Sequence, residues 1–181
     1  MKKVILHGDK IILRFLETRD AEELADKINS RDIVRFTARI PYPYRLKDAR
    51  DFIKKQKLQV QKKEDFVFLI TDKNSGAIMG AVGLHHIEKK SKKSELGYWL
   101  IKEKWGQGIV SEAVKLVLGF GFQTLQLHRI YAYCFEANIG SKKVLLKNGF
   151  TIEGKVRESE YRFGKWHNLL QFSILKKEYK K

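Results

Sequence analysis

Apolar and polar positions alternate along the 181 residues in short segments that predict strands and amphipathic helices. Phe66–Ile70 is a continuous apolar run, which predicts a strand buried on both faces. Asp72–Gly76 has the composition of a turn and would join this strand to a hairpin partner at Ala77–Ile87. Apolar side chains at helical spacing over residues 114–122 predict a helix with one buried stripe. The pattern therefore favours an α/β fold with a mixed, strongly twisted central sheet flanked by helices.

The rest of the chain continues this pattern without a linker, a repeat or a low-complexity segment. Further strands are predicted at Lys10–Leu16, Glu95–Ile101, Arg129–Phe135, Phe150–Phe163 and Leu169–Leu175. Further helices are predicted at about residues 20–29, 46–62 and 141–148. Pro41 and Pro43 exclude a helix between the first two of these, because proline restricts φ and lacks a backbone N–H. We expect residues 1–181 to form one domain with a sizeable core.

The stretch from Glu95 to Glu112 carries the strongest chemical signal. An apolar strand leads into a loop with two glycines, and a helix follows directly: Trp105, Gly106, Gln107, Gly108, Ile109, Val110 and Ser111. Glycine permits positive φ and close backbone approach. Such a loop aims backbone N–H groups and a helix N-terminus at one point, which suits a phosphate or pyrophosphate. The alternative is a glycine turn before a helix that binds no ligand.

The second half of the chain adds motifs in a fixed order. Leu127–Ile130 opens a strand, Asn138 and Ser141 follow at Asn-x-x-Ser spacing, and Leu146–Phe150 closes a helix. Glu153-Gly154 and Gly164–Asn168 come after them. Together with the glycine loop, these motifs resemble the Gcn5-related N-acetyltransferase (GNAT) superfamily and, within it, the RimJ/RimL-type N-acetyltransferases, over residues 10–179. The resemblance implies acetyl-CoA as co-substrate and no metal. It also implies two central strands that splay apart to hold the pantetheine arm.

The resemblance also implies a set of coenzyme-binding residues. The superfamily pattern of the pyrophosphate loop is Gln/Arg-x-x-Gly-x-Gly/Ala, of which this chain keeps only Gly108; Trp-Gly-x-Gly is typical of RimJ/RimL-type members. Backbone groups of the strand would bind the pantetheine amides and polarise the thioester carbonyl. Ordinary core packing is the alternative for the two strand aromatics, and helix capping is the alternative for the asparagine. The set is Tyr98, Trp99, Leu100, Trp105, Gly106, Gln107, Gly108, Ile109, Val110, Ser111, Asn138, Ser141 and Lys143.

Candidate catalytic residues come from the same resemblance. Many superfamily members use a tyrosine acid in the helix after the asparagine, but Leu145 stands at that place here. RimJ/RimL-type enzymes place a serine at the position of Ser141, where it can protonate the leaving thiolate. The same comparison nominates Glu160 as the base, and Glu95 at the start of a strand beside the cleft is a second candidate. Each of these carboxylates has an ordinary surface role as its alternative. Cys134 is expected to be a buried structural thiol.

The formal net charge of +16, from 37 Lys and Arg against 21 Asp and Glu, affects the choice of acceptor. A basic surface attracts coenzyme A, nucleic acid or the ribosome, and dispersed lysines are also typical of a well-solvated surface. Such a chain would repel polycations unless four carboxylates built a local acidic pocket: Glu95, Glu136, Glu158 and Glu160. A protein α-amine has a pKa of roughly 8, against about 10.4 for lysine, so it needs less help from a base.

The leading hypothesis is therefore direct acetyl transfer from acetyl-CoA to the α-amine of a protein, ribosomal in particular. The alternatives are a polyamine or aminoglycoside acetyltransferase and a coenzyme-binding, ribosome-associated module without turnover. We expect a cytoplasmic protein, because the one cysteine excludes an internal disulfide framework and no apolar run approaches the roughly 20 residues of a membrane span. The apolar part of Met1–Gly8 is too short for a signal peptide. Tyr161, Phe163 and Trp166 would line either a homodimer contact or the acceptor site.

Overall fold

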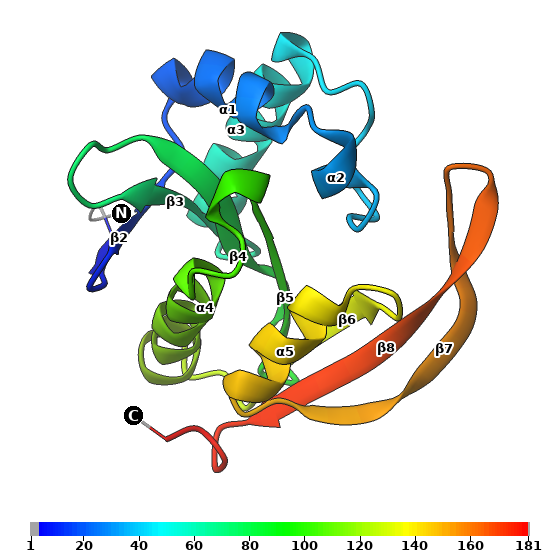
Figure 1. Ribbon diagram of the computed structural model, residues 1–181. Coiled ribbons are helices and arrows are strands. Elements are labelled where there is room, and N and C mark those ends of the chain that lie inside the picture. Colours follow the sequence, from blue (N-terminus) through cyan, green and yellow to red (C-terminus); the bar gives the residue numbers. More distant parts are fainter. Residues whose placement is uncertain (1–3, 181) are drawn as a thin grey trace.

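The computed structural model describes residues 4–180 and is built on an eight-stranded sheet with the order β1-β2-β3-β4-β5-β6-β8-β7 (Figure 1). Four residues lie outside the described part of the chain: Met1–Lys3 and Lys181. The first three belong to the N-terminal segment whose apolar part the sequence analysis found too short for a signal peptide. The strands are β1 (Ile5–His7), β2 (Ile11–Phe15), β3 (Phe66–Asp72), β4 (Ile78–Glu88), β5 (Lys93–Leu100), β6 (Arg129–Phe135), β7 (Thr151–Arg162) and β8 (Lys165–Leu175). The α-helices are α1 (Ala21–Ile28), α2 (Arg31–Val34), α3 (Leu46–Lys62), α4 (Ile109–Gly119) and α5 (Ile139–Lys147). Two short 3-10 helices, η1 (Thr18–Asp20) and η2 (Lys102–Lys104), and a π-helical turn after α4, η3 (Phe120–Thr124), complete the fold.

The predicted mixed α/β fold is confirmed, and each predicted strand and helix is present within a few residues of its expected bounds. Two short elements, β1 and α2, were not predicted. The start of the last strand was also wrong, since β8 begins at Lys165 and not at Leu169. Phe163 and Gly164 both have positive φ, 50° and 81°, so two residues are enough to turn the chain.

The sheet carries a separate hydrophobic core on each face. Phe68 in β3 packs with Val114 and its neighbours on α4. Leu69, the next residue, points to the opposite face and packs with Leu24 of α1 and Ile53 of α3. Figure 1 shows α1 and α3 together on one side of the sheet and α4 on the other. Burial on both sides explains why β3 is a continuous apolar run, as the sequence predicted.

The two central strands separate partway along their length. β5 and β6 are parallel and pair only through Lys93–Glu95 and Arg129–Tyr131. Residues 96–100 of β5 continue to pair with β4, whereas residues 132–135 of β6 pair with β8. The expected splayed pair is therefore present, and the sheet opens just after Glu95.

The hairpin of β7 and β8 extends beyond the other strands and curves toward α2 (Figure 1). A register shift between Val156 and Glu160 bends it, and Glu158 has a φ of 48° at this bulge. The Arg162 guanidinium at its tip donates from Nη2 to the carbonyls of Val34 (3.0 Å) and Ile40 (2.8 Å). These bonds join the hairpin to the segment after α2. None of the helices in residues 4–180 combines the length and apolar character that crossing a membrane requires.

Candidate functional site

A cavity of about 540 Å³ lies where β5 and β6 separate. Its walls are the end of β5, the glycine loop, the first turns of α4 and α5, and the segment around α2. Every residue of the predicted coenzyme set lines it except Gln107. The Gln107 side chain instead donates from Nε2 to the Glu103 carbonyl (2.9 Å). The two predicted carboxylates, Glu95 and Glu160, are not among the residues that line this cavity.

The glycine loop has the conformation that the sequence predicted. Gly106 and Gly108 have φ of 75° and 80°, which side-chain-bearing residues rarely adopt. Space is not the reason for glycine here, because a Cβ at either position would meet nothing within 4 Å. Trp105, which replaces the polar residue of the superfamily pattern, anchors the loop by donating from its indole Nε1 to the Leu100 carbonyl (2.8 Å). The loop is thereby tied to the end of β5.

Two helix N-termini border the same cavity. The Glu112 N–H donates to the Gly108 carbonyl (3.0 Å), so the three preceding N–H groups have no acceptor within the helix. At α5, the side chain of Asn138 caps the helix by accepting from the Ser141 N–H (3.0 Å). Three lysines also line the cavity: Lys104, Lys143 and Lys147. Free N–H groups, helix dipoles and lysines together make this end of the cavity suitable for phosphates.

A half-buried pair of hydroxyl groups, from Tyr98 and Ser141, lines the cavity. The Tyr98 Oη is 2.7 Å from the Ser141 Oγ, and either atom can be the donor. The Tyr98 hydroxyl also lies 3.3 Å from the Ser141 carbonyl oxygen, and burial raises the pKa of Tyr98, so the hydroxyl keeps its proton. Cys134 is buried beside them, and burial raises the pKa of its thiol too. The sequence predicted a role only for the backbone groups of Tyr98. Nothing in the sequence indicated that its side chain would contact Ser141.

Glu95 stands at the point where the strands part. Its carboxylate is 2.8 Å from the Arg39 Nη2, and its side chain is 16% exposed against 60% for Arg39. Glu95 pairs in register with Tyr131, and burial together with the Glu95 charge raises the pKa of that tyrosine. The sequence did not predict Arg39 as a site residue, because no motif includes it.

Glu160 lies on the hairpin and does not line the cavity that contains Tyr98 and Ser141. It is directly opposite His167 in the antiparallel register, so both side chains leave the same face of the hairpin. The His167 ring lies 5.5 Å from that of Phe135 at the end of β6. Glu160 therefore lies on the face of the hairpin that contacts the end of β6 through His167. Glu136, another of the four carboxylates considered for an acidic pocket, forms an ion pair with Lys155 (2.8 Å). Among residues 4–180, no group of three or more His, Cys, Asp or Glu is arranged to hold a metal ion.

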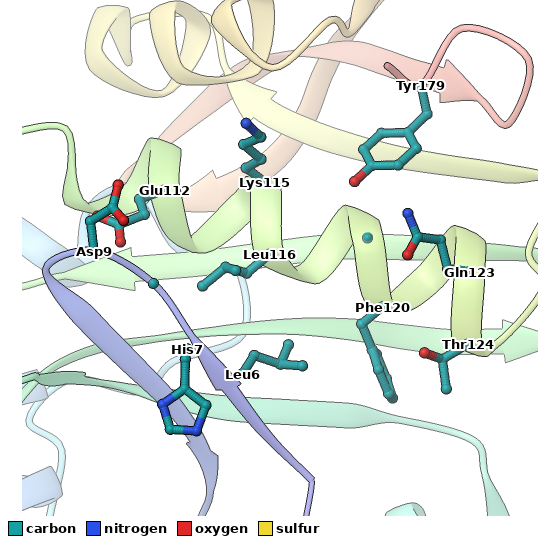
Figure 2. A pocket seen from close by; sticks show the side chains of 12 residues that line it. Leu6, His7, Asp9, Glu112, Lys115, Leu116, Phe120, Gln123, Thr124 and Tyr179 are labelled. Atoms are coloured by element: carbon teal, nitrogen blue, oxygen red, sulfur yellow. The ribbon is translucent and has the colours of Figure 1, made fainter. Parts of the chain in front are cut away.

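A second cavity, of about 420 Å³, lies between the turn after β1, helix α4 and Tyr179 near the C-terminus (Figure 2). Glu112 and Lys115 of α4 line it, but no residue of the predicted site does. The Glu112 carboxylate accepts from the backbone N–H of Lys10 (3.1 Å), and so holds the β1–β2 turn against the helix. This cavity is part of the packing of the first hairpin against α4.

Comparison with known sequences places the chain in a family. A family model described as an acetyltransferase (GNAT) domain matches residues 10–151. The putative ribosomal N-acetyltransferase YdaF of Bacillus subtilis is 30% identical over 178 residues, covering 95% of this chain and 94% of YdaF. The spermidine N(1)-acetyltransferase of Escherichia coli is 24% identical over 169 residues, covering 92% of this chain and 87% of the relative.

Solved structures agree in fold. A probable acetyltransferase superposes with a TM-score of 0.86 at 27% identity, covering 97% of this chain and 99% of the other. The microcin C7 self-immunity acetyltransferase MccE, solved in complex with acetyl-CoA and AMP, superposes with a TM-score of 0.83 at 26% identity and covers 93% of each chain. The family model and these structures confirm the resemblance inferred from the motifs. The chain belongs to the Gcn5-related N-acetyltransferase (GNAT) family and is an N-acetyltransferase.

Proposed function

We propose that this enzyme transfers the acetyl group of acetyl-CoA directly to the α-amine at the N-terminus of a protein. The observation that carries the proposal is the cavity at the strand split, where two helix N-termini and three lysines adjoin the half-buried hydroxyl pair of Tyr98 and Ser141. The helix N-termini and the lysines suit the phosphates of the coenzyme, and the hydroxyl pair suits its thioester. The complex of MccE with acetyl-CoA supports the choice of coenzyme.

The proposed binding mode follows the cavity from the glycine loop inward. The diphosphate lies against the free N–H groups at the start of α4, and Lys143 on α5 neutralises part of the phosphate charge. The pantetheine arm takes the backbone groups that β5 does not share with β6 after Glu95. This path brings the thioester to Ser141, and an N–H of residues 98–100 stabilises the oxyanion.

The proposed reaction breaks the C–S bond of the thioester and forms a C–N bond to the acceptor. The acceptor nitrogen attacks as a neutral amine, and the proton that it loses passes to Glu160 or Glu95, directly or through water. The sulfur leaves as a thiolate and takes the proton of the Ser141 hydroxyl. Ser141 regains a proton from the carboxylate base through water, so the proton lost by the amine ends on the thiol of coenzyme A. Tyr98 is a positioning residue, because its hydroxyl holds the Ser141 Oγ by a hydrogen bond.

The charges around the cleft support an α-amine over a polyamine. A polyamine site needs several unpaired carboxylates. Of the four that the sequence indicated, Glu95 pairs with Arg39 and Glu136 pairs with Lys155. Within residues 4–180, only Glu158 and Glu160 of these four form no ion pair. The name of the relative YdaF makes a ribosomal protein the first acceptor to test. The spermidine relative, at lower identity, makes spermidine the competing acceptor.

The test is release of coenzyme A from acetyl-CoA across an acceptor panel. The panel holds spermidine, an aminoglycoside, and short peptides with free or blocked N-termini that begin with Ser, Ala or Met. We expect turnover with free N-termini and none with blocked ones. Turnover with spermidine alone would establish the polyamine function instead. Acetyl-CoA binding without turnover on any acceptor, intact ribosomal proteins included, would leave a coenzyme-binding module.

A further inference from the structure

Four arginines lie on α2, the segment after it and the tip of the hairpin: Arg31, Arg35, Arg39 and Arg162, here called the arginine rim. Arg162 and Arg31 approach the same ring, with each guanidinium carbon 5.3 Å from the centre of Phe163. Arg35 lines the cavity and lies 4.8 Å from the ring of Phe36. Arg162 also donates to the carbonyls of Val34 and Ile40, the two end residues of the segment 34–40. The rim therefore links α2 to the tip of the hairpin.

The rim carries an excess of positive charge. Asp32 is the one carboxylate in residues 31–45, and it already binds the Lys102 Nζ (2.7 Å) as well as Arg35 (3.5 Å). In the part of the chain that the structure describes, no carboxylate pairs with Arg31 or Arg162. An acceptor that enters past α2 therefore meets these guanidinium groups, together with the carboxylates Glu158 and Glu160 on the same hairpin as Arg162.

Arg39 is the rim residue that connects this charge to the reaction centre. Its guanidinium neutralises Glu95 at the point where the strands part, at 2.8 Å. The Arg39 side chain is 60% exposed, so it can turn toward solvent, whereas the Glu95 side chain is 16% exposed and belongs to a paired part of β5. An acceptor ammonium that arrives at Glu95 takes the place of the guanidinium, and Arg39 is then free to bind another anion.

We infer that Arg39 selects acceptors whose terminal amine is followed, within a few residues, by an acidic side chain. This inference rests on the proposed function. In the complex, the acceptor ammonium binds Glu95 and the acceptor carboxylate binds Arg39, so each charge of the original pair keeps an opposite partner. A polycation supplies the first contact but not the second, and its remaining charges face the arginine rim. Arg39 is thus a specificity-determining residue.

The test compares three peptides that share a first residue and carry two glutamates, two glutamines or two lysines after it. Each is assayed for kcat/KM with the natural chain, with Arg39→Gln and with Arg50→Gln. Arg50 is an exposed residue of α3, so its replacement removes the same unit of charge outside the cleft. This control separates a local effect from the attraction that a chain of +16 exerts on any acidic peptide.

We expect the natural chain and Arg50→Gln to prefer the acidic over the neutral peptide by about tenfold, and Arg39→Gln by less than about twofold. Equal acetyl-CoA affinity in all three chains would confirm that the cleft is intact. An equal loss of preference in both variants, or turnover of all peptides without any preference in the natural chain, would overturn the inference and leave the proposed function standing. Absence of turnover with every free N-terminus would overturn both.

Discussion

Replacement of Tyr98 by phenylalanine tests how the leaving thiolate receives its proton. The change removes one hydroxyl and leaves the half-buried ring in place. That hydroxyl lies 2.7 Å from the Ser141 Oγ. A hydrogen bond of this kind contributes about 1 to 1.5 kcal/mol, which corresponds to roughly a tenfold fall in kcat if it serves only the transition state. The KM for acetyl-CoA should stay within about twofold, because the coenzyme contacts proposed for β5 are backbone groups.

A double-mutant cycle separates positioning from packing. Release of coenzyme A is measured at saturating acetyl-CoA for Tyr98→Phe, Ser141→Ala and the double variant. If Tyr98 acts through Ser141, the double variant should be no slower than Ser141→Ala by more than about twofold. Tyr44→Phe is the matched control, since Tyr44 is a buried tyrosine in the other core and burial raises its pKa to about 12. A positioning role for Tyr98 is refuted if Tyr98→Phe lowers kcat by the same factor with and without Ser141. It is also refuted if the change raises KM and leaves kcat unchanged.

Three further predictions concern other parts of the chain. Cys134→Ala should keep kcat within about twofold, because direct transfer needs no thiol nucleophile; mass spectrometry of the natural chain with acetyl-CoA should find no acetylated cysteine. Gly108→Ala should weaken acetyl-CoA binding by about tenfold in calorimetry because of its positive φ, whereas Gly154→Ala, which has open space and ordinary φ, should not. Hydrogen bonds from Arg129 lower the pKa of Glu153 from 4.5 to about 2. The ionised Glu153 carboxylate therefore contributes fully to the free energy of unfolding above pH 4.5, and this contribution is lost as pH falls through about 2. Urea unfolding should therefore show Glu153→Gln to be less stable than the natural chain at neutral pH, with the difference shrinking below pH 4.5.

Elements with a clear periodicity could be predicted from the sequence almost to the residue. The strand Arg129–Phe135 and the helix Leu46–Lys62 have the expected bounds. Helix α2 was missed, because four residues are too few to show a helical pattern. The hairpin turn at Phe163-Gly164 was missed because phenylalanine is an unusual residue for a position with positive φ. Local signals thus predicted regular structure and failed where one residue departs from its usual preference.

The candidate site also has local features that the sequence indicated and long-range contacts that it did not. The glycine loop and the Asn138 cap lie within a few residues of their partners, so the sequence alone indicated them. The contacts that define the chemistry join distant positions: Tyr98 and Ser141 are 43 residues apart, and Arg39 and Glu95 are 56 apart. Such pairs depend on how the strands and the segment after α2 meet in space, and a single sequence contains no record of that.

The separation of β5 from β6 accounts for both halves of the site. Before the split, Glu95 lies in a paired region of the sheet, which holds its carboxylate at a fixed depth beside Arg39. After the split, β5 has backbone groups without a strand partner on that side, and Tyr98 reaches across to Ser141. A coenzyme that enters from the glycine loop and an acceptor that enters past the arginine rim therefore approach the same opening from opposite ends. Because both entrances are basic, the charge of the chain favours an anionic coenzyme and an acidic acceptor by the same physical effect, and salt should weaken both.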